Sequence, residues 1–230
     1  MALNGKSAIV TGGASGVGYA VAERLVRGGA RVIFADIDMD AGREAEKRLS
    51  TLGAAIFVKS DVSRRLDVHN LVASALNLHG GVDVLVTAAA HRRPVGFLDL
   101  REDQLDRAVA VNLKGLFLPA QAVGRCLAEQ VDAGGEPGSI IAVGRLDGDA
   151  ASADFAWQVT RAAIHEMVRA LAAALSRWRI RVNAIGVEGP AMTGTTDVDE
   201  AVAATAEWLA SGGAGDLSGA ILTPGEAGSH

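Results

Sequence analysis

Residues 11–18 of this chain read Thr-Gly-Gly-Ala-Ser-Gly-Val-Gly, directly after the apolar run 7–10 and before a helical pattern at 16–28. Glycine is needed where a chain turns sharply from a strand into a helix and must approach a pyrophosphate, which the free N–H groups of the helix then bind. We interpret the stretch as a nucleotide-binding turn; a plain tight turn is the alternative. The candidate contacts are Gly12, Ser15, Gly16, Val17 and Gly18.

Short apolar runs alternate with longer helical patterns along the rest of the chain. We expect strands at about 7–10, 31–35, 55–58, 82–86, 139–143, 180–185 and 220–222. We expect helices at about 16–28, 40–52, 64–79, 102–130, 154–177 and 199–210. Several strands are uniformly apolar, which is typical of a parallel sheet covered on both faces. The pattern predicts the α/β class: one doubly wound, Rossmann-like domain over 1–230, with about seven strands, helices on both faces and a substrate cleft in its C-terminal half.

The second predicted strand ends at Asp36, about 20 residues beyond the glycines, where an acid can accept hydrogen bonds from the adenosine ribose. The same carboxylate would repel a 2′-phosphate, and no Lys or Arg lies in the glycine-rich turn or directly after Asp36. We therefore predict NAD rather than NADP as the cofactor. The alternative is that Asp36, two residues before Asp38, only caps the next helix.

Composition and charge exclude several other classes of protein. The formal net charge of −5 argues against a nucleic-acid partner, because phosphate-binding surfaces are usually basic. The lone Cys126 excludes an internal disulfide and a cysteine-cluster metal site, and its apolar helical pattern indicates a core position. Residues 1–6 do not read as a signal peptide, and charges interrupt the alanine-rich stretch 162–175, so we expect a cytoplasmic protein without a membrane span.

Several further motifs, together with the glycine-rich turn, are similar to those of the classical short-chain dehydrogenase/reductase family. They are Asp61-Val62, Asn112 within 111–115, the run 181–185 and the run 217–222. Residues 87–90, Thr-Ala-Ala-Ala, stand where the family has Asn-Asn-Ala-Gly. The resemblance spans nearly the whole chain. It implies further cofactor contacts at Asp61, Val62, Ala88, Ala89 and Ala90, and a homodimer or homotetramer built on the helices at 102–130 and 154–177.

The chain departs from the family where the chemistry is expected. Aligned on the run 181–185, Trp157 stands at the family's Tyr position and Arg161 at its Lys position, where it could still hold the nicotinamide ribose. The family's Ser position falls on Gly144 or Arg145, so only Asn112 of the four catalytic residues is retained. A shifted alignment restores no tyrosine, because the only one in the chain is Tyr19. Outside these positions, Val187-Glu188 replaces the family's Pro-Gly, and Ala90 adds a methyl group where the backbone approaches the cofactor.

An indole N–H cannot serve as an acid at neutral pH, and an arginine keeps its proton. We therefore expect an NAD(H)-binding pseudoenzyme of oxidoreductase lineage, with a regulatory role or as the partner of an active relative. One alternative is an oxidoreductase whose proton donor is His91 or a water molecule. Another is a non-redox enzyme, or a binder of a small anionic molecule, that uses Arg145 and Arg161 as a clamp.

The remaining candidates have simpler interpretations beside the functional ones. His91 and Arg92, followed by Arg93, are also consistent with a solvated basic loop. Arg145 could instead pair with Asp147 or Asp149. The remaining histidines show no metal-ligand spacing, and we interpret them as structural or exposed; they are His69, His79, His165 and His230.

Overall fold

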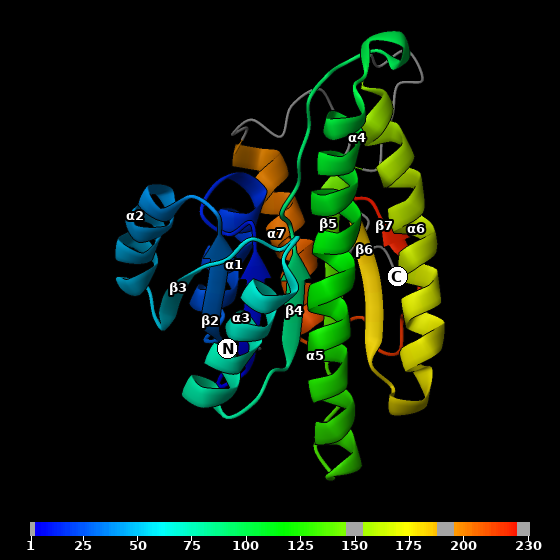
Figure 1. The fold of residues 1–230 in the computed structure, drawn as a ribbon. Coiled ribbons are helices and arrows are strands. Elements are labelled where there is room, and N and C mark those ends of the chain that lie inside the picture. The colour runs from blue at the N-terminus through cyan, green and yellow to red at the C-terminus, as the bar shows by residue number, and fades with distance from the viewer. Residues whose placement is uncertain (1–2, 146–153, 188–195, 225–230) are drawn as a thin grey trace.

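The computed structural model describes residues 3–145, 154–187 and 196–224. Its seven strands form one parallel sheet in the order β3-β2-β1-β4-β5-β6-β7 (Figure 1). The strands are β1 (Ser7–Thr11), β2 (Arg31–Asp36), β3 (Ala55–Lys59), β4 (Val84–Thr87), β5 (Ser139–Arg145), β6 (Arg181–Val187) and β7 (Ile221–Leu222). The predicted α/β class and the doubly wound sheet are confirmed.

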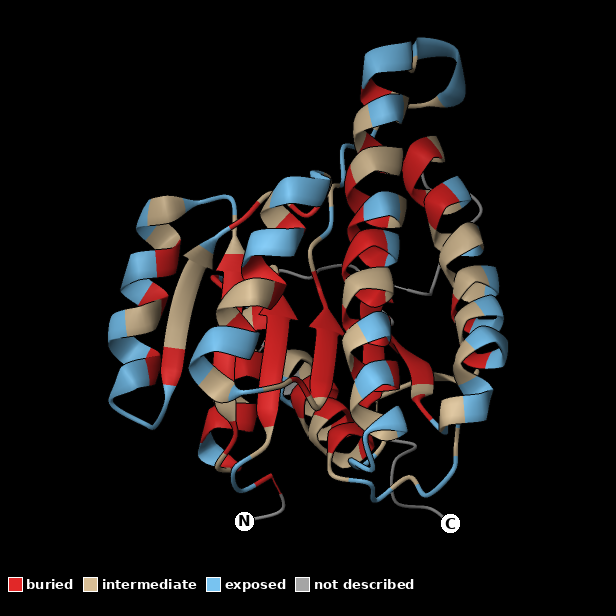
Figure 2. Cartoon of the chain, turned by 60° about the horizontal axis from the view of Figure 1, so that its bottom comes forward, coloured by how far each residue is buried: buried red, intermediate tan, exposed pale blue. Residues whose placement is uncertain are grey.

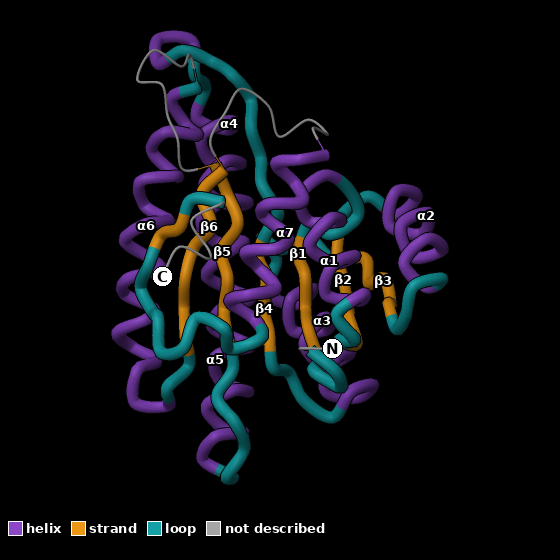
Figure 3. The backbone as a smooth tube through the Cα atoms, turned by 180° about the vertical axis from the view of Figure 1, so that it is seen from behind, coloured by secondary structure: helices purple, strands orange, loops and turns teal. Residues whose placement is uncertain are grey.

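Helices cover both faces of the sheet. Helices α1 (Gly16–Arg27), α2 (Met39–Ser50) and α7 (Thr196–Ala210) pack on one face, which Figure 3 shows from that side. Helices α3 (Arg65–His79), α5 (Lys114–Asp132) and α6 (Phe155–Leu175) pack on the other. The central strands are buried along their length and lie between two apolar clusters, as the red ribbons of Figure 2 show. This double burial explains why the strand sequences are uniformly apolar.

The long helix expected at 102–130 is two helices joined by a wider turn. Helix α4 (Glu102–Ala108) continues into one turn of π-helix at Val109–Leu113, and α5 follows directly. Within that turn the Lys114 N–H donates to the Val109 carbonyl, five residues earlier. The turn carries Asn112, which is buried. The prediction of a single helix at 102–130 is therefore wrong. A π-helical turn contains one residue more than an α-helical turn, and the spacing of hydrophobic residues along the sequence does not reveal so small a difference.

Some element boundaries differ from the prediction by two or three residues, and two short elements were not predicted. Helix α7 begins at Thr196, three residues before the expected start, and β4 begins at Val84 rather than at 82. Short 3-10 helices occur at Phe97–Asp99 and Ser176–Trp178. Within the described part of the chain, no helix is long and apolar enough to span a bilayer.

The strand order places the candidate site. Strand β1 lies between β2 and β4, and the connections β1–α1–β2 and β4–α5–β5 cross opposite faces of the sheet on its two sides. A crevice opens at such a point, beyond the carboxyl ends of the strands. Thr11 at the end of β1 is in register with Ala35 on β2 and with Thr87 on β4. The glycine-rich turn, Asp36 and residues 88–90 therefore meet at one edge.

Candidate functional site

A cavity of about 390 Å³ lies at this edge of the sheet. It is lined by all the predicted cofactor residues except Arg161: Gly12, Ser15, Gly16, Val17, Gly18, Asp36, Asp61, Val62, Ala88, Ala89 and Ala90. Other lining residues include Ser60, His91, Arg92, Arg107 and Trp157. The structure thus brings segments from six parts of the chain around one hollow.

The glycine-rich turn requires its glycines for steric reasons. Gly12 has a φ of +69°, and a Cβ on it would lie 2.6 Å from the Ala89 backbone nitrogen. A Cβ on Gly18 would lie 2.0 Å from the Gly12 carbonyl oxygen. Ser15 is the N-cap residue of α1, and its side chain makes no capping hydrogen bond. The first N–H groups of α1 therefore remain available at the cavity, as phosphate binding requires.

Asp36 lies at the wall of the cavity and is not a helix cap. Its Oδ2 accepts a hydrogen bond from the Ala14 N–H at 3.3 Å, and its Oδ1 accepts one from the Asp38 N–H at 3.2 Å. The cap of α2 is Asp38, whose Oδ1 accepts from the N–H groups of Asp40 and Ala41 at 3.0 Å each. The alternative interpretation of Asp36 as the N-cap is therefore wrong.

Asp61 is held in its ionised form at the same end. Its Oδ1 accepts hydrogen bonds from the Ser63 backbone N–H at 2.9 Å and from the Ser63 hydroxyl at 2.6 Å. Its Oδ2 lies 3.7 Å from the Arg107 guanidinium. Partial burial would raise the pKa of Asp61, but the Ser63 hydrogen bonds and the nearby arginines outweigh it, so the pKa is lowered. No sequence motif pointed to Arg107.

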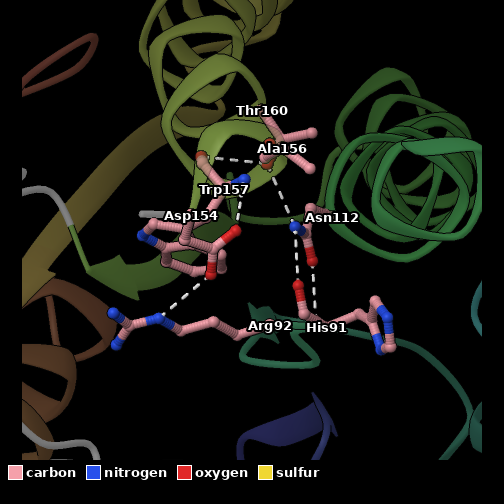
Figure 4. A network of polar contacts seen from close by, with 7 residues as sticks. All are labelled: His91, Arg92, Asn112, Asp154, Ala156, Trp157 and Thr160. Atoms are coloured by element: carbon pink, nitrogen blue, oxygen red, sulfur yellow. Dashed lines mark hydrogen bonds and ion pairs between the residues drawn. The ribbon is translucent and has the colours of Figure 1, made fainter. Parts of the chain in front are cut away.

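Asn112 joins the loop after β4 to α6 (Figure 4). Its Oδ1 accepts a hydrogen bond from the His91 N–H at 2.7 Å. Its Nδ2 donates to the His91 carbonyl at 3.1 Å and to the Thr160 Oγ1 at 3.0 Å. Both amide hydrogens and the amide oxygen are thus engaged, which gives Asn112 a structural role.

Asp36 and Asp61 follow β2 and β3 on one side of β1, whereas Trp157 is on α6, which packs against β5 and β6 on the other side, so Trp157 lies at the opposite end of the cavity. Its side chain is buried, and its Nε1 has no hydrogen-bond acceptor among the described residues. It also lines a hollow of about 20 Å³ together with Asn112 and Gly144. The structure therefore brings these three predicted catalytic positions together, and a Cβ on Gly144 would meet no described atom within 4 Å.

The predicted arginine clamp falls partly outside the described residues. Arg161 follows Trp157 by one turn of α6. Arg145 ends β5, but its side chain and the whole of Asp147 and Asp149 lie outside the described part. Glu188 and His230 do so as well. The proposed pairing of Arg145 therefore stays a prediction.

An ion pair between the buried Asp154 and the partly exposed Arg92, which sequence reasoning missed, lies beside Trp157. Asp154, 1% exposed, caps α6 by accepting from the Trp157 backbone N–H at 3.1 Å. Its Oδ2 also accepts a hydrogen bond from the Arg92 Nε at 3.2 Å. In Figure 4 the Arg92 guanidinium and the His91 ring point to opposite sides. The sequence separation of 62 positions between Arg92 and Asp154 explains why no local pattern indicated the pair.

The other histidines and the cysteine lie away from the cavity. The His79 Nδ1 is 2.9 Å from the Ser7 Oγ, and burial lowers the pKa of His79. Burial also lowers the pKa of His165, while His69 is exposed. Cys126 is half-buried against the core, as expected, and burial raises the pKa of its thiol.

Comparison with known proteins identifies the lineage of this chain. A family model described as enoyl-(acyl carrier protein) reductase matches residues 12–216. Tropinone reductase-like 1 from Erythroxylum coca is 33% identical over 225 residues, which cover 96% of this chain and 79% of that protein. Short-chain dehydrogenase reductase 5 from Arabidopsis thaliana is 32% identical over 200 residues, covering 86% of this chain and 75% of that protein.

A solved structure extends the comparison to a bound cofactor. The crystal structure of 3-ketoacyl-(acyl-carrier-protein) reductase from Brucella melitensis complexed with NADH has a TM-score of 0.86 and 27% identity to this chain. The match covers 98% of this chain and 99% of that one. The sequence and structural similarity agree over nearly the whole chain, and the family is one of nicotinamide-dependent oxidoreductases. This chain belongs to the short-chain dehydrogenase/reductase family.

Proposed function

We propose that this chain binds NAD(H) and lacks the family's usual proton-donor chemistry, so that it works as a pseudoenzyme with a regulatory role or as the partner of an active relative. One observation carries the proposal. A single cavity has the glycine-rich turn and Asp36 at one end and the buried indole of Trp157 at the other. The first end fits a dinucleotide, whereas the second, among the described residues, has an indole N–H where the family has a phenol as proton donor.

The residues at the first end fit the cofactor. The glycine turn and the uncapped start of α1 would hold the pyrophosphate, and Asp36 would accept hydrogen bonds from the adenosine ribose. Asp61 and Val62 would lie against the adenine, as the family resemblance implies. When bound, the cofactor supplies or accepts a hydride. The Asp36 carboxylate supports NAD over NADP, because it would repel a 2′-phosphate.

The absence of a suitable acid follows from the sequence and from where its tyrosine lies. Tyr19, the only tyrosine, is on α1 and packs against the apolar cluster on the α1–α2–α7 face. The Arg48 guanidinium lies 4.7 Å from its ring centroid, and burial raises the pKa of Tyr19. Tyr19 is not among the residues that line the main cavity. Gly144 likewise has no hydroxyl with which to orient a carbonyl group.

Relatives with reductase names favour a competing function, an oxidoreductase with another proton donor. His91 lines the cavity and is the candidate for that role. Fluorescence titration with NADH and NADPH, followed by a screen of carbonyl and alcohol substrates, separates the two functions. We expect NADH to bind without turnover. Robust turnover that His91→Ala abolishes would replace our proposal with the competing one.

A restoration experiment tests whether the substituted positions cause the loss. We expect oxidoreductase activity to appear in the combined variant Gly144→Ser, Trp157→Tyr and Arg161→Lys, and in none of the single variants. The serine fits, because a Cβ at residue 144 meets no described atom within 4 Å. A matched variant with Trp157→Phe, which has the ring but no hydroxyl, is expected to remain inactive.

A further inference from the structure

We propose that the Trp157 end of the cavity binds a small ligand through a carboxylate group, which the Arg92 guanidinium and the Trp157 indole N–H would hold. The inference rests on the proposed function only in placing the dinucleotide at the other end of the same cavity. It assigns Arg92 as the anion-binding residue, rather than the Arg145 and Arg161 clamp that one alternative interpretation of the sequence offered.

Two side chains at this end carry hydrogen-bond donors that have no acceptor among the described residues. Arg92 and Trp157 both line the cavity. The guanidinium of Arg92 uses its Nε on Asp154, and among the described residues neither of its terminal nitrogens has an acceptor. The buried Trp157 Nε1 also has no acceptor in the described part of the chain. A buried donor such as the Trp157 N–H is costly without an acceptor, and a ligand oxygen would relieve this cost. The Arg92 side chain is 38% exposed.

Arg92 is held in place before any ligand arrives. Asp154, 1% exposed, is anchored by its own role as the cap of α6 and fixes the Arg92 Nε at 3.2 Å. The loop that carries Arg92 has two more contacts with the start of α6. The Phe155 N–H donates to the Val95 carbonyl at 3.3 Å, and the Phe97 and Phe155 rings lie 4.9 Å apart. A preorganised donor loses less entropy on binding than a mobile one.

The positive charge of Arg92 at this end favours a ligand carboxylate over a cationic group or a neutral hydrogen-bond donor. The other arginine that lines the cavity, Arg107, faces Asp61 at 3.7 Å. Asp154 is nearly fully buried, and its two oxygens are used by Trp157 and Arg92, so it offers little to a ligand. With Nε occupied, the terminal nitrogens of Arg92 present the planar fork that matches the two oxygens of a carboxylate.

Indole N–H signals in a ¹⁵N–¹H correlation spectrum test the proposal directly. The chain has three tryptophans, and Trp157→Phe assigns the signal of interest. The probes are 4-oxopentanoate and benzoate, each paired with its methyl ester, added to the full chain without cofactor. We expect both carboxylates to shift the Trp157 signal and the esters to bind about tenfold more weakly or worse, because they lack the charge. Trp178, whose Nε1 donates to Asp132 at 3.0 Å, serves as the internal control.

Variants of Arg92 complete the test. Arg92→Met is expected to abolish the shift, whereas Arg93→Met, a neighbouring exposed arginine that does not line the cavity, leaves it unchanged. If Arg92→Met fails to fold because Asp154 is left unpaired, the double variant with Asp154→Asn removes both charges and keeps a capping side chain. No shift by either carboxylate, equal binding of the esters, or a shift that survives the loss of Arg92 would overturn the proposal.

Two different results would separate a failure of the carboxylate site from a failure of the proposed function. Normal NADH binding with no carboxylate shift would overturn the anion site alone. A carboxylate shift that depends on Arg92 in a protein that binds neither NADH nor NADPH would support the anion site and overturn the proposed function.

Discussion

The two ends of the cavity are built on different principles. At the dinucleotide end, binding relies on backbone geometry: a turn that glycine alone can form, the start of α1, and one carboxylate at Asp36. At the Trp157 end, function relies on individual side chains, and the residues present differ from those of the family. A Cβ at Gly144 meets no described atom within 4 Å, whereas one at Gly12 or Gly18 lies closer than 3.0 Å to the chain's own backbone. Chemistry can therefore change while the fold and its cofactor crevice persist.

The largest expected effect comes from breaking the backbone-built end. Gly18→Ala places a Cβ 2.0 Å from the Gly12 carbonyl oxygen, so the turn has to move. We expect the free energy of unfolding to fall by about 3 kcal/mol, at the upper end of overpacking costs, with NADH binding lost. Urea denaturation and NADH fluorescence measure the two effects. Gly80→Ala is the control: φ there is +80°, but a Cβ meets no described atom within 4 Å, so we expect only about 1 kcal/mol of strain.

The second-largest expected effect is a loss of stability when the Asn112 side chain, near the Trp157 end of the cavity, is removed. Asn112→Ala leaves the backbone N–H and carbonyl of His91 without their partners. We expect a loss of about 2 kcal/mol in stability, typical of unsatisfied buried groups, with NADH affinity nearly unchanged. Asn70→Ala, at an exposed position on α3, is the control in the same urea titration. A loss of NADH affinity without a loss of stability would show that Asn112 acts on the ligand instead.

A smaller effect concerns the carboxylate at Asp36. Asp36→Ala is expected to weaken NADH binding about tenfold, equivalent to about 1.4 kcal/mol, because the ribose loses a charged acceptor. NADPH binding is expected to improve relative to NADH, since the repulsion of a 2′-phosphate is removed. Parallel titrations with both dinucleotides measure the change. An unchanged ratio of the two affinities would contradict the assignment of Asp36 to the ribose.

The smallest effect is a dependence of stability on acid pH. The folded-state pKa of Asp61 is lowered, so its ionised form stabilises the fold above its ordinary pKa of 3.8. That contribution is lost as the pH falls through the lowered folded-state value. We expect Asp61→Asn to reduce the slope of unfolding free energy against pH between about pH 5 and pH 3. An identical slope in the variant and the parent protein would exclude this contribution.

The features predictable from the sequence are those encoded locally. The strands and the glycine-rich turn follow from short apolar runs and from a motif of eight residues, 11–18, and the place of Asp36 follows from where a strand ends. The pair of Arg92 and Asp154 and the pair of Arg107 and Asp61 join residues distant in sequence, so only the folded chain reveals them.

The π-helical turn could not be predicted from the sequence either, because it depends on contacts with residues far away in the chain. Its sequence, Val109–Leu113, has ordinary helical character, and the extra residue accommodates the contacts of Asn112 with His91 and Thr160. These partners come from the loop after β4 and from α6. The family resemblance pointed to Asn112, but periodicity within one helix cannot report contacts that the helix makes with other elements.

The steric fit of the glycine turn has an evolutionary consequence. The Cβ positions of Gly12 and Gly18 are excluded by the chain's own backbone, not by a bound molecule. Selection for folding alone would therefore preserve both glycines in a descendant that no longer met any nucleotide. Among the described residues, Asp36 accepts two long hydrogen bonds, from the N–H groups of Ala14 and Asp38, so folding would constrain it far less. Across the descendants of this chain, drift at residue 36 would be the earlier sign that nucleotide binding had been abandoned.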